Sequence, residues 1–458
     1  MTKKHNLLFF SLFALFILLF WLTWFLSGGC TSSVQESLTT STTSSTTTTT
    51  TIGPIAGALD PDFGFGGMVS IEGAKSYGSA VDSSDRIIVV GSSGYYSGGS
   101  PSDRTVWRFK TNGNPDDNFG RNGSGMVIED RLDGIFKLVA VDSQRIVVAG
   151  TTADGLAVLS YQLNGDPDNG FNGDGIATVN MSDMGLGGGG FEIKDMHIDP
   201  SGKILILSNT VVPENMIIWR FNSNGSLDTT FDGKGYLIYS ENNKDSVGNS
   251  ITVASPDRIF VAGYSNLLGN PKKMTVWKFL SNGSPEAKKV FSTPEDSYGD
   301  KVLIDSDGRV IVIGYNSSLT WSPLSGPNRI DVWRYSSDLD PDITFNSTGR
   351  VEFNGMGDAG GAIDSFGNII IAGGVGNIII EGELIKFKLV IWRYKSDGTP
   401  DTDFGNGTGQ VSYSMDSFNL ANYDKLDGPP MMLDSSGRLI FAARVKGTVN
   451  KMIIFRFK

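Results

Sequence analysis

One short apolar segment recurs seven times in this chain, and its spacing limits the folds that the sequence can adopt. The first copy is Arg86–Gly91 (RIIVVG). The six later copies begin at Arg145, Lys203, Arg258, Arg309, Asn368 and Arg438, at intervals of 59, 58, 55, 51, 59 and 70 residues. Because an apolar run follows a polar turn each time, the pattern indicates an array of one repeated supersecondary unit.

Each repeat predicts four strands. In the first repeat they are the stretch that ends at Ala80-Val81-Asp82, then Arg86–Val90, Thr105–Phe109 and Gly125–Ile128. The second and third strands are apolar on both faces, as a sheet covered on both sides requires. Gly is 58 of 458 residues, mostly in turn contexts, which indicates many short strands. Four-stranded units of this length favour a β-propeller over a solenoid.

The two ends of the repeat region complement each other. Phe63–Ile71 matches a connection and a fourth strand, whereas Met452–Lys458 matches a third strand, after which the chain stops. We therefore expect an all-β fold over residues 56–458, a seven-bladed β-propeller of four-stranded antiparallel blades. The N-terminal strand would complete the last blade and leave no stray edge strand. We expect a monomer.

The repeat also resembles a known family. The segments Leu59–Gly67 (LDPDFGFGG), Ala80–Gly91 (AVDSSDRIIVVG) and Trp107–Gly113 (WRFKTNG) resemble the bacterial "delta-60" repeat of exported proteins, over about residues 57–458. The resemblance implies a propeller-like fold and no particular activity. The fourth repeat departs from it, because Ser284–Lys289 replaces the usual Asp-containing connection.

The N-terminus has the pattern of an export signal. Lys3-Lys4-His5 precedes an apolar run, Leu7–Leu26, and Ser27-Gly28-Gly29-Cys30 follows, within a leader of residues 1–30. This resembles a bacterial lipoprotein signal, in which Cys30 would be lipidated. The alternative is an uncleaved transmembrane anchor, since about 20 apolar residues can span a bilayer. Mass spectrometry of the mature N-terminus distinguishes the two.

The next segment, residues 31–55, is rich in Ser and Thr, which predicts a disordered tether. Either form of anchor makes the membrane a partner. The protein is thus expected to be exported and held at the bacterial cell envelope.

Charge and residue types exclude several classes of function. The net charge is -11 without a basic cluster, which argues against a nucleic-acid partner. Cys30 is the one cysteine, and His5 and His197 are the two histidines, so a disulfide, a thiolate cage or a multi-histidine zinc site cannot form. His197 falls in a predicted first strand, which lines the channel of a propeller, and we interpret it as structural.

Paired aspartates recur in the connections between third and fourth strands. The pairs are Asp60/Asp62, Asp166/Asp168, Asp340/Asp342 and Asp401/Asp403. Aspartates close turns with their own side chains, and this is the interpretation we favour; calcium binding is the alternative. Gly187–Gly190 lacks the following Lys-Ser/Thr of a phosphate-binding loop. We expect no cofactor, with calcium as the one candidate.

Variation between the repeats lies mostly on one face. The turn from the first to the second strand and the connection from the third to the fourth are nearly constant, whereas the other two connections vary. In repeat proteins such an irregular face often binds the ligand. Its loops supply our candidate ligand-binding residues, Tyr95, Tyr96, Trp321, Phe418, Tyr423 and Asp424. Residues 377–388 are predicted to form a projecting hairpin.

Aromatic side chains on such loops suit a sugar or a protein anchor, and the alternative is that they pack on the blades beneath. The chain is therefore expected to be a binding or scaffold module for a protein or glycan. The alternatives are a polysaccharide-active hydrolase or lyase that uses channel carboxylates, and a purely structural envelope protein.

Overall fold

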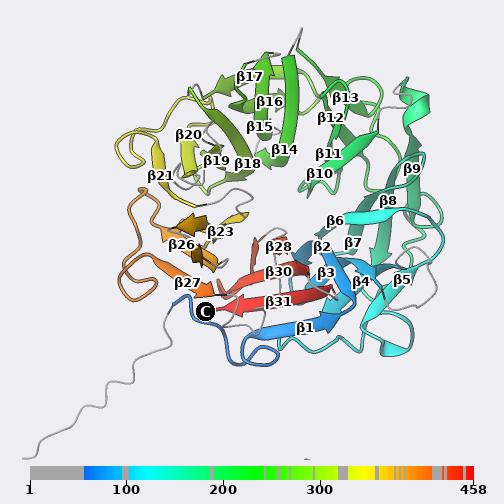
Figure 1. The fold of residues 1–458 in the computed structure, drawn as a ribbon. Coiled ribbons are helices and arrows are strands. Elements are labelled where there is room, and N and C mark those ends of the chain that lie inside the picture. Colours follow the sequence, from blue (N-terminus) through cyan, green and yellow to red (C-terminus); the bar gives the residue numbers. More distant parts are fainter. Residues whose placement is uncertain are drawn as a thin grey trace, which may run out of the picture. The chain divides into compact units, whose positions relative to one another are not determined.

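In the computed structural model of the chain, residues 1–52 and 53–458 form two separate units. Structure is described for residues 56–458 except 95–102, 186–189, 242–243, 255–257, 268–269, 292–293, 318–328, 356–359, 376–377, 381–382, 386–387, 415–424, 428–430 and 447–449. All of these described residues lie in the second unit. Figure 1 shows its strands in successive sheets that follow one another around a ring.

Six sheets of four antiparallel strands follow one another along the chain, and we number them blades 1 to 6. Blade 1 is β2 (Ala74–Val81), β3 (Ile87–Ser93), β4 (Asp103–Phe109) and β5 (Met126–Glu129); blade 2 is β6 (Ile135–Val141), β7 (Arg145–Thr151), β8 (Gly155–Gln162) and β9 (Ile176–Asn180). Blade 3 is β10 (Phe191–Ile198), β11 (Ile204–Thr210), β12 (Met216–Phe221) and β13 (Tyr236–Tyr239); blade 4 is β14 (Lys244–Ala254), β15 (Arg258–Leu267), β16 (Lys273–Leu280) and β17 (Pro285–Val290). Blade 5 is β18 (Asp296–Ile304), β19 (Val310–Ser317), β20 (Arg329–Tyr335) and β21 (Arg350–Asn354); blade 6 is β22 (Gly360–Ile363), β23 (Ile369–Val375), β26 (Lys388–Tyr394) and β27 (Gln410–Ser414).

Blade 7 is built from both ends of the folded unit. Its inner edge is β28 (Lys425–Asp427) and β29 (Met431–Leu433), which both pair with β30 (Leu439–Lys446), followed by β31 (Lys451–Phe457) and, outermost, β1 (Met68–Glu72). The N-terminal strand β1 is antiparallel to β31, with Met68 opposite Phe455. The innermost strands β2, β6, β10, β14, β18, β22 and β29 contact one another in this order, and β29 contacts β2. The predicted seven-bladed propeller, closed by its N-terminal strand, is confirmed.

A hairpin and two short helical turns complete the described structure. The hairpin of β24 (Ile378–Ile380) and β25 (Glu383–Ile385) forms its own two-stranded sheet, as expected for residues 377–388. The helical turns are 3-10 helices, η1 (Arg121–Gly123) and η2 (Met181–Met184). Within the ranges given above, no helix has the length and apolar character needed to cross a membrane.

The second and third strands of the blades form the core. Ile87, Ile88, Val89 and Val90 of β3 are all fully buried, because each blade packs against a neighbour on both of its faces. Each such aliphatic side chain contributes roughly 1.5–3 kcal/mol on burial. The repeated apolar runs therefore supply much of the stability of the fold.

In most blades an arginine near the end of the third strand donates hydrogen bonds to the connection that leads to the fourth strand. We call this set of hydrogen bonds the clamp. In blade 1, Arg108 Nε donates to Asp116 Oδ2 at 2.7 Å, and its Nη1 donates to the carbonyl of Leu163 in blade 2. The same bond from arginine to its own connection recurs in the pairs Arg220–Asp228, Arg334–Asp342, Arg393–Asp401 and Arg456–Asp60. Three of these arginines also donate to the next blade, at the carbonyls of Ser281, Ser396 and Thr111.

The paired aspartates of the sequence belong to this clamp. Asp60 Oδ1 accepts a hydrogen bond from the backbone N–H of Asp62 at 3.2 Å, and Asp401 Oδ1 accepts one from Asp403 at 3.1 Å. The predicted turn-closing role is confirmed. Among the described residues, no three Asp, Glu, His or Cys side chains form a group suited to a metal ion. The calcium alternative stays a prediction.

Blade 2 lacks the arginine of the third strand and replaces it from another strand. Ser160 stands at that position and donates to Asp168 at 2.8 Å. The missing bond to the next blade comes from Arg145, at the start of the second strand, whose Nη1 donates to the carbonyl of Ser223 in blade 3. The junction between blades 2 and 3 therefore keeps an arginine hydrogen bond between blades, although its donor lies on the second strand and not on the third.

A phenylalanine and a glycine meet at most junctions between blades. The connecting segment of one blade ends in a buried phenylalanine, which lies against a left-handed glycine in the turn of the next. At Gly225, where φ is +86°, an added Cβ would lie 2.9 Å from ring atoms of Phe171. The other pairs are Phe119–Gly165, Phe231–Gly283, Phe345–Gly398 and Phe404–Gly57. Only glycine combines this backbone conformation with the close approach of the ring.

The junction between blades 4 and 5 departs from this pattern. The chain enters β17 at Pro285, directly after the turn, so blade 4 has no long connection with a terminal phenylalanine. In blade 5 the glycine position holds Leu339, at φ 66° and only 3% exposed. Lys278 replaces the arginine, and its Nζ lies 3.0 Å from Asp338 Oδ1 of blade 5. The leucine side chain thus occupies space that the phenylalanine fills elsewhere.

Candidate functional site

The residues chosen from the loops lie outside the described part of the chain. They are Tyr95, Tyr96, Trp321, Phe418, Tyr423 and Asp424. Cys30, the predicted lipidation site, also lies outside it. The loop candidates therefore stay predictions.

The innermost strands carry a feature that the sequence did not reveal. In β2, β6, β10, β14 and β18 the pairing with the second strand slips by one residue at nearly the same place, four residues before the last paired residue in every strand except β14, where it is five. The bulged residues are Tyr77, Lys137, Lys194, Asn249 and Asp300. A bulge leaves one residue unpaired and re-aims its side chain. Five blades thus present five side chains of varied chemistry at one level of the ring.

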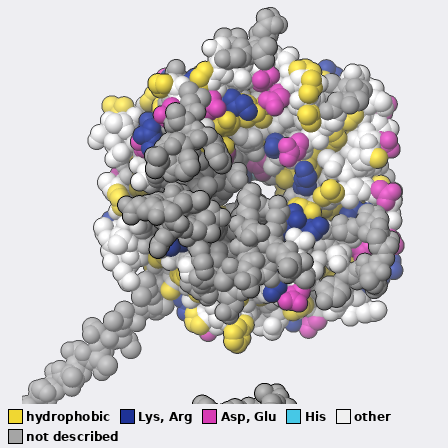
Figure 2. Space-filling view, in the orientation of Figure 1, with side chains coloured by type: hydrophobic (Ala, Val, Ile, Leu, Met, Phe, Trp, Pro, Cys, Tyr) yellow, Lys and Arg dark blue, Asp and Glu magenta, His cyan; other side chains and the backbone are white. Residues whose placement is uncertain are grey.

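All five bulged residues line one cavity of about 470 Å³ in the channel. The cavity lies toward the irregular face, because Tyr264 and Tyr315 belong to the last parts of second strands and Lys272 precedes a third strand. Figure 2 shows a hollow at the centre of this face, with basic and acidic side chains beside it. Its volume suits a small ligand or one or two sugar units.

The charge of this cavity is opposite to that of the chain. Its ionisable lining comprises four lysines (137, 194, 272 and 301) and two aspartates (195 and 300), which gives a formal charge of +2. The whole sequence has a net charge of -11. The lysines of this lining can attract an anion, although the carboxylate of Glu192 contacts two of them.

Asp195 is the centre of a saturated network. Its Oδ2 accepts hydrogen bonds from Ser250 Oγ at 2.7 Å, from the backbone N–H of Ile251 at 3.1 Å and from Lys301 Nζ at 3.1 Å. Its Oδ1 accepts one from the backbone N–H of Met196 at 2.9 Å. These bonds tie blades 3, 4 and 5 together, so Lys301 and Asp195 act mainly as a fixed part of the wall.

Lys137 and Lys194 hold one carboxylate between them. Lys194 Nζ lies 2.9 Å from Glu192 Oε2, and Lys137 Nζ lies 3.7 Å from Glu192 Oε1. Burial raises the pKa of Glu192, but the hydrogen bond from Lys194 and the charges of both lysines outweigh it, so the pKa falls below its ordinary value. The group carries one net positive charge, and Glu192 remains 52% exposed.

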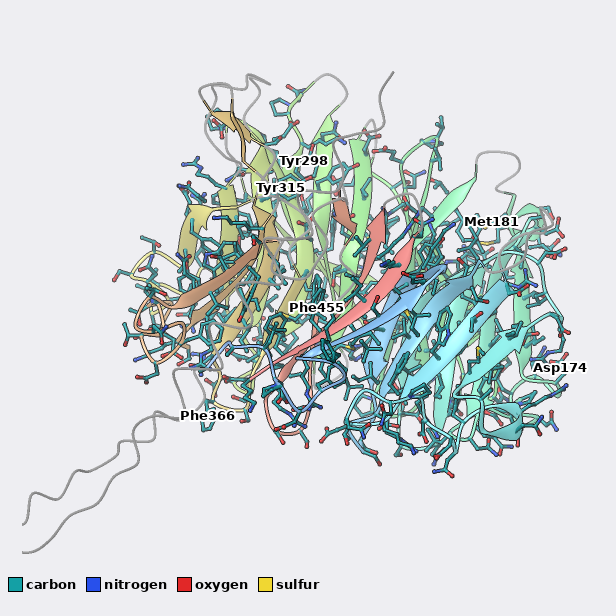
Figure 3. The ribbon with its side chains drawn as sticks, turned by 60° about the horizontal axis from the view of Figure 1, so that its bottom comes forward. Asp174, Met181, Tyr298, Tyr315, Phe366 and Phe455 are labelled. Carbon is teal, nitrogen blue, oxygen red and sulfur yellow. The ribbon has the colours of Figure 1, made fainter. Side chains whose placement is uncertain are left out.

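Tyrosines form the opposite wall. The rings of Tyr298 and Tyr315 stack at 4.7 Å with 16° between their planes, and Tyr264 meets Tyr298 edge-on at 5.2 Å. Lys272 Nζ lies 4.3 Å from the centre of the Tyr264 ring. Figure 3 shows Tyr298 and Tyr315 side by side, at the end of the ring opposite Phe366. Burial first, then the nearby Asp296, raises the pKa of Tyr298 to about 12, so its hydroxyl stays protonated.

The one histidine of the folded unit is not among the residues that line the cavity. His197 follows Met196 in β10, as expected, and burial lowers its pKa, which keeps it neutral at neutral pH. The arrangement therefore offers lysines, tyrosine rings and amide or hydroxyl groups for binding.

Comparison with known proteins agrees with this architecture. The profile of one family, "Domain of unknown function (DUF5122) beta-propeller", matches residues 83–119 and 200–231. The chain is a β-propeller repeat protein. Among curated proteins, none matches the sequence.

Several solved structures are similar to the propeller at low sequence identity. Sqt1 from Chaetomium thermophilum is 11% identical, with a TM-score of 0.45 over 84% of this chain and 97% of its own. Drosophila Semaphorin 2a is 10% identical, with a TM-score of 0.44 over 88% and 76%. An ulvan lyase of polysaccharide lyase family PL25 is 10% identical, with a TM-score of 0.43 over 87% and 92%. None of these similarities bears on the ligand or the activity of the present chain.

A second cavity lies at the junction between blades 4 and 5, where the phenylalanine–glycine contact of most other junctions is missing. Its volume is about 430 Å³, and its lining includes Phe291, Trp333, Tyr335, Arg350 and Glu352. Arg350 covers the Phe291 ring at 4.8 Å and bonds the fully buried Asp331, with its Nε 2.8 Å from Oδ1. Burial raises the pKa of Asp331 to about 6, although the charge of Arg350 opposes this.

Asp331 should make part of the stability depend on pH. Its pKa in the folded propeller is about 6, against an ordinary value of 3.8, so the folded state binds its proton more tightly than the unfolded state. Its contribution is therefore greatest below about pH 4 and is lost as pH rises toward 6. Urea unfolding from pH 4 to 7 should show this loss in the parent chain and not in Asp331→Asn. Equal pH slopes in the two proteins would contradict the prediction.

Proposed function

We propose that this propeller is a binding module that takes a glycan or protein ligand in the channel cavity on its irregular face. The observation that carries the proposal is the cavity of about 470 Å³, which has a lining charge of +2 in a chain of -11. Such a site concentrates a ligand of opposite charge. The Ser/Thr-rich tether and the N-terminal anchor, with Cys30 lipidated or the leader retained, would hold the module at the bacterial envelope.

A hydrolase or lyase that acts on polysaccharides is the second candidate. The observation in its favour is that two carboxylates, Asp195 and Asp300, line the cavity. A general base needs a lone pair free for the proton that it takes. Asp195 already accepts four hydrogen bonds, one of them from a lysine, which disfavours that role. Binding is therefore the function that we favour.

A glycan array and an assay for released reducing ends separate the two functions. We expect the full-length chain, solubilised in detergent, to retain glycans without releasing new reducing ends. The variants Asp195→Asn and Asp300→Asn serve as the check on catalysis. Release of reducing ends by the parent chain, abolished by either substitution in a protein that still melts normally, would overturn the binding-module proposal.

A further inference from the structure

We infer that the channel ligand is an acidic sugar unit whose carboxylate or sulfate replaces Glu192 between Lys137 and Lys194. This inference rests on the proposed function and adds the chemical class of the ligand and the place of its charge.

The lysine pair is the part of the cavity best suited to take an anion. Lys301 is committed to Asp195, and Lys272 lies over a tyrosine ring. Lys137 and Lys194 share one carboxylate, and the longer of their two contacts to it is 3.7 Å. The pair is therefore only half neutralised. An added carboxylate or sulfate would gain a charge-assisted hydrogen bond from each ammonium group.

The carboxylate of Glu192 lies between the two lysines, in the place that the anionic group of the ligand would take. Glu192 lies on β10 two residues before Lys194, and its side chain is 52% exposed, so it can turn away into solvent. It gives the two lysines one negative charge to share. A ligand anion must compete with Glu192, so this carboxylate lowers the affinity for acidic ligands and does not create it.

The tyrosine wall favours a sugar as the carrier of the anion. The stacked rings of Tyr298 and Tyr315 are each partly exposed at the cavity. Aromatic side chains bind the apolar faces of ligands while their hydroxyls bind polar groups. The Tyr298 hydroxyl stays protonated and lies 3.4 Å from the carboxylate of Asp296, so the negative group of a ligand is favoured at the lysine pair and not at this wall. Asn249 and Ser250 supply further polar groups on blade 4.

Isothermal titration of the full-length chain in detergent tests the inference with matched probes. Oligogalacturonate and its methyl ester differ in the carboxylate, which the ester replaces with an uncharged methyl ester group, and dextran sulfate and dextran differ in sulfate. Polyglutamate represents an acidic protein. We expect one acidic glycan to bind, its neutral counterpart to bind at least about tenfold more weakly, and added salt to weaken binding.

Three variants test whether the negative group of the ligand binds between Lys137 and Lys194. Lys194→Ala should weaken binding of the acidic glycan about tenfold, the effect of one charge-assisted hydrogen bond. Glu192→Gln should strengthen it by a similar factor, because the internal competitor is removed. Lys110→Ala is the matched control: this lysine pairs with Asp117 in a connection on the uniform face and should change nothing.

The outcomes distinguish failure of the inference from failure of the proposed function. Equal binding of the neutral and acidic glycans would overturn the inference and leave a binding module. Binding of polyglutamate alone would replace the sugar with an acidic protein ligand and also overturn it. Acidic binding that neither Lys194→Ala nor Glu192→Gln changes would place the ligand elsewhere. If no probe and no glycan on the array binds, the glycan-binding form of the proposed function fails as well.

Discussion

Replacing Arg456 with alanine is expected to lower the free energy of unfolding by about 3 kcal/mol, the lower end of the cost of breaking a buried ion pair. Arg456 is on β31, and Asp60 precedes β1, so this pair joins the two ends of the folded unit. Arg456 Nε and Nη2 each lie 2.8 Å from Asp60 Oδ2, and both side chains are at most 3% exposed. The variant leaves Asp60 buried beside more distant cations, Lys458 at 3.6 Å and Arg438 at 3.7 Å.

Chemical denaturation at several pH values measures this effect and its cause. Arg456 helps to hold the pKa of Asp60 below its ordinary value of 3.8 despite burial, so the pair contributes stability above that pH and loses it on acidification. The gap in unfolding free energy between parent and variant should therefore stay constant above about pH 4 and narrow as pH falls below it. Arg121→Ala, in the exposed helical turn η1, is the control and should change stability by less than about 0.5 kcal/mol. A gap that stays constant with pH would contradict the ion-pair explanation.

Replacing Leu339 with alanine is expected to cost about 3 kcal/mol, as for other buried leucines that leave a cavity. Leu339 is 3% exposed and packs with Trp333, Tyr335 and Phe260 at the junction of blades 4 and 5. Its positive φ of 66° would by itself favour glycine. We nevertheless expect Leu339→Gly to be destabilising too, because the lost contacts outweigh the relief of backbone strain.

The mirror substitution tests the explanation at a junction that has its phenylalanine. Gly225→Leu should destabilise strongly, since Phe171 already occupies the space and φ is +86°. Thermal melts and urea titrations of the three variants give the comparison. A Leu339→Gly variant more stable than the parent would show that strain, and not packing, governs this junction.

Most of the architecture could be predicted because it depends on patterns that repeat. The run Ile87–Val90 predicts a strand that is buried on both faces. The complementary segments Phe63–Ile71 and Met452–Lys458 predict that the two ends of the repeat region close the ring. The bulges escaped the sequence analysis because an unpaired residue has no periodic signature. Lys137 and Lys194 were also passed over, since a net charge of -11 conceals a local excess of lysine.

One signal for the site does exist in the sequence. Counted back from the last paired residue of each first strand, by four residues or, in β14, by five, the repeats carry Tyr77, Lys137, Lys194, Asn249 and Asp300. Four of these five residues are a tyrosine or carry a charge. The aromatic loop residues were chosen for the variability of their loops alone, which does not indicate where their side chains point.

The ring of bulges has an evolutionary consequence. A residue in a regular ladder must suit its cross-strand neighbour and the blade packed against it, so most substitutions there lower stability. A bulged residue is released from that pairing, and the bulge is made by the backbone around it. The chain can therefore exchange Tyr, Lys, Asn or Asp at these five positions at little cost to the scaffold. Selection can alter ligand preference one side chain at a time while the repeats that hold the ring together stay fixed.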